Sequence, residues 1–454
     1  MTTRHLPALF EFGAATSAFQ IEGALTLDGR GESIWDCFCR KPGTIADGST
    51  AELACDHYRR MPEDIAIMKD MGLTAYRFSI SWPRIFPNGR GKIESRGLDF
   101  YQRMTDLLLD ADIKPFITLH HWDLPQAIQD RGGWADRDCV DDFCIFAEAV
   151  TQRLGDRVKH WITINEPWCI ASLGYRQGVH APGIRDPRTS LAVAHHVLLA
   201  HGRAVPIVRA NSPECDVGIA LNLTPGYAAT QKPQDQYAAN IHDGTFNRWY
   251  LDPLYFGKYP EDIVTYYQTC GDLPPGDFPF VRQNDMKEIS APMDFLGVNY
   301  YTRAICRDQH TDNREGRQPG HETEMGWEVY PDGLFDLLVR LNREYRIPGI
   351  YISENGCSYS DGPGITGAIN DQRRIDYLDQ HLQQCRKAIT EGVPLSGYFV
   401  WSLLDNFEWQ FGYRQRFGLV WVDYFNGRRT LKASAHWYRE QIISSRRTAT
   451  EIHA

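Results

Sequence analysis

The sequence lacks the features that are typical of exported proteins, membrane-spanning proteins and proteins held together by disulfides or zinc. Its 11 cysteines are odd in number and form no Cys-x-x-Cys pair, which excludes the usual disulfide frameworks and zinc-site spacings. Residues 1–20 contain no basic segment followed by a long apolar run, and no segment reaches the roughly 18 apolar residues that a membrane helix needs. These absences predict a cytoplasmic protein with reduced thiols and no membrane partner.

Positive charge is scarce relative to negative charge. The 48 Lys and Arg residues against 58 Asp and Glu residues give a formal net charge of -10, which argues against binding to nucleic acid or to an anionic membrane. The chain has no internal repeat and no low-complexity tract. A small neutral molecule is therefore the expected ligand, and nothing in the sequence indicates an oligomeric state.

Apolar strand-like runs recur along the whole chain. They occupy residues 12–19, 75–82, 115–122, 160–165, 217–223, 295–301, 349–354 and 397–404. Most are nearly continuous in apolar residues, which is typical of parallel strands covered by helices on the outside. Eight such runs separated by helical segments predict an α/β fold, a single (β/α)8 TIM barrel that spans residues 1–454.

The segments between these runs are of two kinds. Some carry one apolar helical stripe, as in Leu98, Tyr101, Met104 and Leu108. Others, residues 28–57, 224–292 and 306–330, are too long for plain barrel turns and are rich in Gly, Pro, Asn and Asp. We expect these extended βα loops to form the walls of a pocket, and the polar end at 444–454 to fray.

Two of the apolar runs end in a glutamate followed by a turn-forming residue. Glu166 precedes Pro167, and Glu354 precedes Asn355 and Gly356. A single glutamate at a strand end is more often a solvated group, but the carboxyl ends of barrel strands meet at one face. Two carboxylates facing one pocket are the minimal equipment for glycoside hydrolysis. A retaining mechanism would place the two carboxyl groups about 5 Å apart.

The other strand ends carry hydrogen-bonding and aromatic side chains. These residues are Gln20, Arg77, His121, Trp122, Asn165, Asn299, Tyr301 and Trp401. Amides and acids can bind the hydroxyl groups around a sugar ring, and indole rings can pack on its face. This composition favours a carbohydrate as the ligand.

The two glutamates need opposite protonation states. We assign Glu354 as the nucleophile, kept ionised by Arg77 and the Tyr301 hydroxyl. We assign Glu166 as the acid and base, with a pKa raised by the neighbouring negative charge in a partly desolvated pocket. Asn299 is predicted to belong to the same catalytic group.

Metal and cofactor sites are less favoured. Adjacent His120 and His121 point to opposite faces of a strand and have no partner at ligand spacing. The glycines of residues 362–367 match a dinucleotide fingerprint only nominally, without a strand-to-helix turn. We therefore predict no metal and no cofactor.

In these motifs the chain resembles glycoside hydrolase family 1, the retaining β-glucosidase family of (β/α)8 barrels. The resemblance covers essentially the whole chain and is carried by residues 12–23, 76–82, 119–125, 165–167, 297–301, 353–356 and 401–409. The family usually has Thr before the nucleophile, whereas this chain has Ser353, which keeps the hydroxyl.

The resemblance implies roles for further residues. Gln20, His121, Asn165, Glu408 and Trp409 would hold the non-reducing sugar, with Trp401 as its stacking platform. The implied lining of the entrance, where the leaving group sits, is Trp168, Trp327 and Phe417. The implied activity is exo-acting hydrolysis of terminal β-D-glucosyl residues, with side activity on β-galactosides and β-fucosides, and the implied substrates are small β-glycosides and short cello-oligosaccharides.

The sequence bears on three alternative functions. Relatives that act on 6-phosphorylated sugars have a Ser where this chain has Glu408, and a carboxylate would repel phosphate. An inactive sugar-binding module would have lost a catalytic glutamate, and this chain keeps both. Glycosyl transfer to another sugar would use the same residues as hydrolysis, so the sequence does not separate these two reactions.

Overall fold

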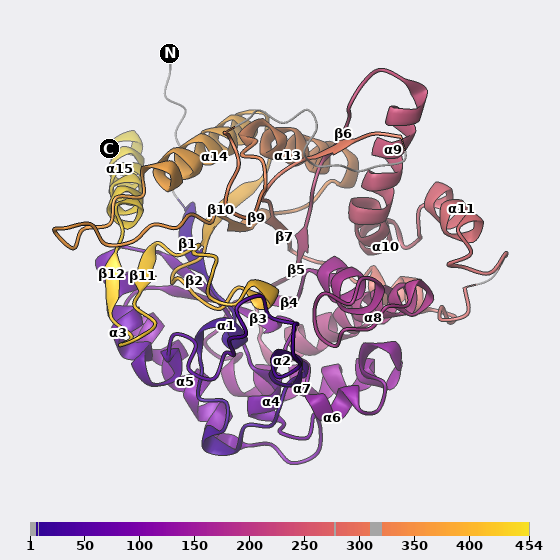
Figure 1. Ribbon diagram of the computed structural model, residues 1–454, viewed down its shortest axis with the longest axis horizontal. Coiled ribbons are helices and arrows are strands. Elements are labelled where there is room, and N and C mark those ends of the chain that lie inside the picture. The colour runs from indigo at the N-terminus through magenta and orange to yellow at the C-terminus, as the bar shows by residue number, and fades with distance from the viewer. Residues whose placement is uncertain (1–5, 8, 277, 309–319, 454) are drawn as a thin grey trace.

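Eight parallel strands form a closed barrel at the centre of the computed structural model, which describes residues 6–7, 9–276, 278–308 and 320–453 (Figure 1). The strands are β1 (Glu11–Ala15), β2 (Ala75–Ser79), β3 (Lys114–His120), β4 (His160–Asn165), β5 (Asp216–Asn222), β7 (Phe295–Asn299), β9 (Ile350–Asn355) and β10 (Leu395–Trp401). Their order around the barrel is β1-β10-β9-β7-β5-β4-β3-β2. The predicted (β/α)8 fold is confirmed.

Several predicted strands run too far at their carboxyl ends. Residues 18–19 belong to α1 (Ala18–Ile21), and Trp82 begins α4 (Trp82–Ile85). Pro83 lies in the first turn of α4 and has no N–H to donate to a strand ladder, so the chain turns into a helix there. Apolar composition alone does not separate a strand end from a short buried helix.

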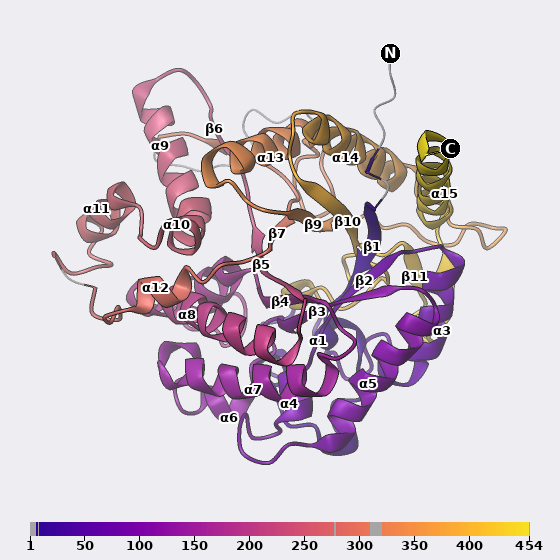
Figure 2. The ribbon, with the colours of Figure 1, turned by 180° about the vertical axis from the view of Figure 1, so that it is seen from behind.

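Helices surround the barrel on its outside (Figures 1 and 2). They include α3 (His57–Asp70), α5 (Ser95–Asp110), α7 (Asp138–Leu154), α8 (Pro187–Asn211), α13 (Pro331–Tyr345), α14 (Gln372–Thr390) and α15 (Ala433–His453). The predicted stripe of α5 is buried at Leu98, Tyr101, Met104 and Leu108. One apolar face of each helix thus packs on the barrel, as the helical period of the sequence indicates.

Aromatic side chains fill the interior of the barrel. Phe116, Phe399 and Tyr351 contact one another with ring centroids 4.9 to 6.4 Å apart, and Phe295 packs on Tyr351 at 5.2 Å. Gly13 faces this cluster, and a Cβ there would lie 2.3 Å from Phe399 Cδ1. The bulk of these rings closes the barrel interior, so that the space for a ligand lies at the strands' carboxyl ends.

The long connections carry secondary structure of their own. The first holds α2 (Ile34–Cys39), and the second holds β6 (Gly226–Ala228), α9 (Pro233–Asp243), α10 (Trp249–Phe256), α11 (Glu261–Thr269) and α12 (Asp285–Ile289). Part of the third, residues 309–319, lies outside the described residues. Shorter elements are α6 (Gln126–Gln129), β8 (Ala304–Cys306), β11 (Val420–Val422) and β12 (Arg429–Leu431).

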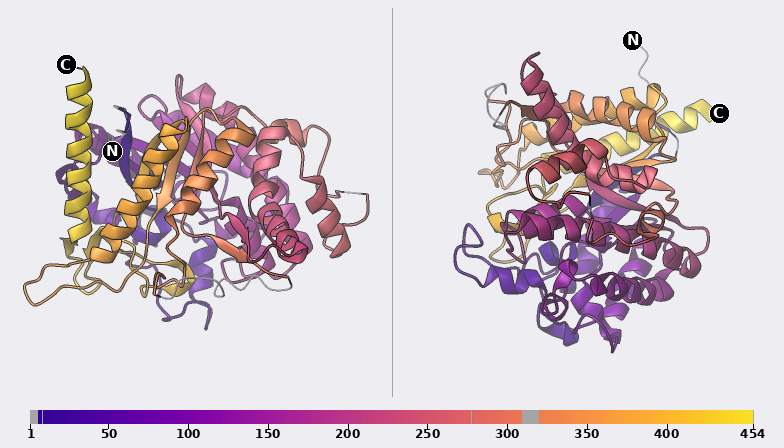
Figure 3. Two further views of the ribbon diagram at one scale, coloured as in Figure 1. Left: turned by 90° about the horizontal axis from the view of Figure 1, so that it is seen from above. Right: turned by 90° about the vertical axis from the view of Figure 1, so that its right-hand side faces the viewer.

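Two helices bear on the sequence-based expectations. Helix α15 extends as far as His453, beside α14 (Figure 3), and the fraying of residues 444–454 stays a prediction. Helix α8 contains an 18-residue window that is apolar enough to cross a membrane, although no such segment was expected. Because 78% of that window is buried inside the protein, its apolar character is accounted for by packing in the core.

Candidate active site

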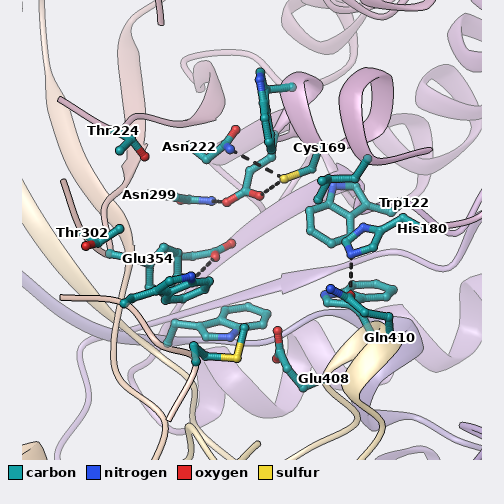
Figure 4. Close-up of a pocket in the computed structure, with 18 of the residues that line it drawn as sticks. Trp122, Cys169, His180, Asn222, Thr224, Asn299, Thr302, Glu354, Glu408 and Gln410 are labelled. Carbon is teal, nitrogen blue, oxygen red and sulfur yellow. Dashed lines mark hydrogen bonds between the residues drawn. The ribbon is translucent and has the colours of Figure 1, made fainter. Parts of the chain in front are cut away.

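A cavity of about 340 Å³ opens at the carboxyl ends of the barrel strands (Figure 4). It is lined by most of the predicted site residues, namely His121, Trp122, Glu166, Trp168, Asn299, Tyr301, Trp327, Glu354, Trp401, Glu408, Trp409 and Phe417. The other three, Gln20, Arg77 and Asn165, lie behind this lining and are at most 1% exposed. Each of these three residues forms a hydrogen bond with a residue that lines the cavity.

Glu354 lies at the end of β9 and is held by two donors. Arg77 Nη1 donates to Oε1 over 2.6 Å, and the Tyr301 hydroxyl donates to Oε2 over 2.6 Å. Burial raises the pKa of this carboxyl, whereas the Arg77 charge and the hydrogen bonds from Tyr301 and Arg77 lower it. Both oxygens therefore accept hydrogen bonds, as suits an ionised carboxylate.

Glu166 directly follows β4 and has different surroundings. Asn299 Nδ2 donates to its Oε1 over 2.6 Å, and the Cys169 thiol donates to its Oε2 over 2.9 Å. No cation forms a salt bridge with it among the residues that the structure describes. Burial first, and the charge of Glu354 second, raise the pKa of Glu166 to about 7. The sequence predicted that the neighbouring charge in a partly desolvated pocket raises this pKa, and in the structure burial is the larger of the two causes.

A chain of hydrogen bonds sets the orientation of the two asparagines. Arg77 Nη2 donates to Asn165 Oδ1 over 2.6 Å, and Asn299 Nδ2 donates to the same oxygen over 3.0 Å. The amide nitrogen of Asn165 then faces His121 Nε2 at 3.0 Å. Burial lowers the pKa of His121 well below its ordinary value, so the ring is neutral and Nε2 accepts this bond.

At the other side of the cavity, the amide of Gln20 lies beside the carboxyl group of Glu408. Gln20 Nε2 donates to the Phe407 carbonyl oxygen over 2.9 Å and lies 3.4 Å from Glu408 Oε2. Burial, followed by the charges of Glu354 and Glu166, raises the pKa of Glu408 to about 8. Three carboxyl groups thus share one cavity, and the ionisation of each disfavours that of the others.

Indole rings form the flat walls beside these polar groups. Trp401 ends β10 and is 4% exposed, and Trp409 is 3% exposed. The His121 ring stacks with both indoles at centroid distances of 5.8 and 6.0 Å. Trp122 lies 4.6 Å from Trp409 and donates its Nε1–H to the Asn165 carbonyl oxygen. Apolar faces and hydrogen-bonding groups therefore alternate around the cavity, as a sugar ring requires.

Residues that the sequence reasoning missed complete the lining. They are Cys169, Leu173, His180, Asn222, Thr224, His242, Phe246, Thr302, Ala304, Met325, Gln410 and Phe411. Phe246 packs on Trp168 at 4.2 Å although it lies within the second long connection. Asn222 is the last residue of β5. It would have been identified if every polar residue at a strand's carboxyl end had been proposed as a site residue.

The two adjacent histidines face different surroundings, as predicted. His120 is 1% exposed and packs edge-on against Trp82 and Trp134 outside the cavity, whereas His121 lines the cavity. Among the described residues, no group of three or more His, Cys, Asp and Glu side chains is arranged to hold a metal ion.

Comparison with known proteins agrees with this geometry. The model of the family described as Glycosyl hydrolase family 1 matches residues 2–447. Beta-glucosidase A of Acetivibrio thermocellus is 49% identical over 444 residues, 96% of this chain and 98% of that protein. The 1,4-beta-D-glucan glucohydrolase of Thermotoga neapolitana is 43% identical over 447 residues, 97% of this chain and 98% of that protein.

Among solved structures, the beta-glucosidase from Thermotoga maritima in complex with glucoimidazole matches with a TM-score of 0.93 and 43% sequence identity. The match covers 98% of this chain and 100% of that chain. The family predicted from the motifs is thus confirmed along nearly the whole length. This chain is a glycoside hydrolase, and it belongs to glycosyl hydrolase family 1.

Proposed function

We propose that this protein is a retaining, exo-acting β-glucosidase that hydrolyses terminal non-reducing β-D-glucosyl residues. The observation that carries the proposal is the pair of glutamates in one cavity with opposite surroundings. Glu354 accepts hydrogen bonds from Arg77 and Tyr301, whereas Glu166 has a pKa raised to about 7. One carboxyl is thus prepared to attack and the other to donate a proton.

In the first step, Glu354 attacks the anomeric carbon and forms a covalent glycosyl-enzyme, while Glu166 gives its proton to the leaving oxygen. Bond formation at Glu354 removes its negative charge. Because that charge contributes to the raised pKa of Glu166, its loss lowers the pKa and lets Glu166 remain ionised. In the second step, Glu166 takes a proton from water, and the water oxygen attacks the anomeric carbon. The bond from that carbon to Glu354 breaks, the carboxylate is released and the original configuration is restored.

Positioning of the sugar is assigned to the residues around Glu408. His121, Asn165, Gln20 and Glu408 offer hydrogen bonds to hydroxyl groups, while Trp401 is the platform for the ring face. The low exposure of Trp401 and Glu408, 4% and 9%, supports exo action because a further sugar would meet the wall there.

The proposed substrates are small β-glycosides and short cello-oligosaccharides, in accord with the names of the similar glucosidase and glucan glucohydrolase. Side activity on β-galactosides and β-fucosides is part of the proposal. A protonated Glu408 offers both a donor and an acceptor, which suits a sugar hydroxyl in either orientation. The mouth of the cavity, with Trp168, Phe246 and Trp327, would take the leaving group.

The test is a panel of aryl and oligosaccharide β-glycosides, with rates compared as kcat/KM. Proton NMR of the first product distinguishes retention, which yields β-glucose first, from inversion, which yields the α-anomer. Binding of sugar without turnover over days would favour an inactive binding module instead. Oligosaccharide products at high sugar concentration would assign the protein to glycosyl transfer, and a preference for 6-phosphorylated glycosides would contradict the role of Glu408.

A cytoplasmic location is proposed as well. Its support is chemical, since all eleven cysteines are free and would be kept as thiols in a reducing compartment. Detection of the native protein by fractionation of its source cells tests this, and recovery mainly outside the cell membrane would contradict it.

A further inference from the structure

Cys169 lies three residues after Glu166, at the start of a π-helix that spans Cys169–Arg176. It is 7% exposed and lines the cavity. Its thiol donates to Glu166 Oε2 over 2.9 Å, and the sulfur accepts a hydrogen bond from Asn222 Nδ2 over 3.6 Å (Figure 4). The proposed mechanism assigns no function to this residue.

The position of the proton on Glu166 follows from the neighbouring side chains. A guanidinium has only donors, so Asn165 must present its oxygen to Arg77. Asn299 contacts that same oxygen and must therefore present its NH2 group. This amide nitrogen is also the partner of Glu166 Oε1, at 2.6 Å. Oε1 can then only accept, so a protonated Glu166 carries its proton on Oε2.

We propose that Cys169 is a positioning residue for the proposed β-glucosidase reaction. Its thiol holds Oε2 of Glu166 as the oxygen that gives up and takes back the proton. When Oε2 of Glu166 carries the proton, it still has lone pairs that can accept a hydrogen bond. The Cys169 thiol can therefore donate to Oε2 whether Glu166 is protonated or ionised. In the acid form this leaves the Oε2 proton free for the leaving oxygen. The bond is stronger to the ionised form, so it assists proton release.

The thiol itself stays protonated through the cycle. Burial, followed by the charge of Glu166, raises the pKa of Cys169 well above its ordinary value. Asn222 occupies the acceptor side of the sulfur, which leaves the S–H for Glu166. Cys169 thus supplies a donor whose own charge does not change, unlike a lysine or histidine at the same place.

Other charged or titratable groups also act on Glu166. Glu354 at the end of β9 and Arg77 on β2 contribute through their charges, and Tyr301 and Glu408 face the same cavity. These groups are unchanged when Cys169 is replaced. A shift in the titration of Glu166 in such a variant therefore reports on the thiol.

The experiment compares wild type, Cys169→Ala and Cys169→Ser in kcat/KM against pH with 4-nitrophenyl β-glucoside. Loss of the thiol donor disfavours the ionised form of Glu166 and raises its pKa. In Cys169→Ala, the alkaline limb of the kcat/KM profile should therefore move to higher pH by about half a pH unit to one pH unit. Serine keeps a donor and an acceptor and should restore the wild-type limb. With 2,4-dinitrophenyl β-glucoside, whose second step requires ionised Glu166, kcat of Cys169→Ala near pH 6 should fall several-fold.

The matched control is Cys385→Ala, another buried cysteine on α14 away from the cavity. This variant also loses a buried thiol, but both limbs of its kcat/KM profile against pH should stay where they are in the wild type. A Cys169→Ala enzyme that folds and keeps the wild-type limb would overturn the proposal, as would failure of serine to restore it. If alanine prevents folding, Cys169→Val serves as the apolar variant.

A second measurement separates this inference from the function on which it rests. NMR titration of 13C-labelled glutamate carboxyls gives the pKa of Glu166 without turnover, once Glu166→Gln has identified its signal. A rise of that pKa in Cys169→Ala supports the proposal, and an unchanged pKa overturns it. Absence of β-glycoside hydrolysis in the wild type would contradict the proposed function alone.

Discussion

The guanidinium of Arg77 donates to Oε1 of Glu354 over 2.6 Å, and neither side chain is more than 4% exposed. A buried carboxylate of this kind is stable only with a partner, because desolvation of an unpaired charge is costly. The same arginine also sets the orientation of Asn165. One residue therefore supports the ionised state of Glu354 and, through Asn165 and Asn299, the acceptor role of Glu166 Oε1.

Replacement of Arg77 by methionine should impair both stability and activity. Glu354 would lose its ion pair, at a cost of about 3–5 kcal/mol in the free energy of unfolding. Its pKa would rise, so kcat/KM should fall by about 100-fold or more. Urea unfolding and aryl glucoside kinetics measure the two effects. Arg84→Met is a matched control, since Arg84 is equally buried and pairs with Glu22 outside the cavity. A control with an equal loss of kcat/KM would show that the effect on activity is one of folding.

Glu354→Ala should lower the turnover of aryl β-glucosides by several orders of magnitude, since the proposed covalent intermediate needs this carboxylate. Added azide can enter the space left by the carboxylate and attack the same face of the sugar. The product should then be the α-glycosyl azide, detected by NMR. A variant with near-wild-type rates would remove the assignment of Glu354.

Glu166→Ala should show an effect that depends on the leaving group. A 2,4-dinitrophenolate leaves without a proton, so the first step should be nearly unaffected, whereas an alkyl or sugar leaving group should slow it by at least about 100-fold. Azide should rescue the second step and give the β-glycosyl azide. Equal losses with all leaving groups would argue against acid catalysis by Glu166. The series is measured as kcat/KM against leaving-group pKa.

The pH dependence of wild-type kcat/KM should follow the free enzyme's two glutamates. Glu166 must be protonated, and with its pKa near 7 the rate should fall about tenfold per unit above that pH. Glu354 must be ionised, and burial raises its pKa above the ordinary 4.5, so the acid limb should lie above pH 4.5. A bell-shaped profile measured in one buffer series at constant ionic strength checks both limbs. An alkaline limb that persists unchanged in Glu166→Gln would belong to another group.

Glu408→Gln should change the pH dependence of stability. The pKa of Glu408 is raised from 4.5 to about 8 in the folded state, so the folded protein holds this proton more tightly than the unfolded chain does. The associated stability is present below pH 4.5 and is lost as the pH rises through 8. Glutamine resembles the protonated acid. The melting temperature of the variant minus that of the wild type should therefore be larger at pH 9 than at pH 5. Differential scanning calorimetry at both pH values measures this, and an equal difference at both would contradict it.

Much of the fold and part of the site could be predicted from local patterns. The eight apolar runs coincide with the barrel strands, because a strand covered on both faces needs apolar residues throughout. Glu166 and Glu354 stand out since a charged residue at the end of such a run has no packing role. The ends of the runs were less well predicted, as at Trp82, because a buried helical turn and a strand can have the same composition.

The entrance and the partners of the glutamates could not be predicted in this way. Phe246 reaches Trp168 from a connection with no clear periodicity, and Gln20 hydrogen-bonds Asn406 across 386 residues of chain. The thiol of Cys169 contacts Glu166, although no local pattern in the sequence distinguishes this cysteine from the other ten. Each of these contacts depends on how the loops pack over the barrel.

The sequence by itself determined the barrel and the family, and it predicted the two acids, because strand periodicity and strand-end chemistry are local properties of the chain. The tertiary structure decided how the surroundings of the two glutamates differ, and with them the pKa of Glu166. Both Glu166 and Glu354 are buried, and their difference comes from Arg77 and Tyr301 on one side and from Asn299 and Cys169 on the other. A pKa is set by burial and by neighbours in space, which belong to the folded chain alone.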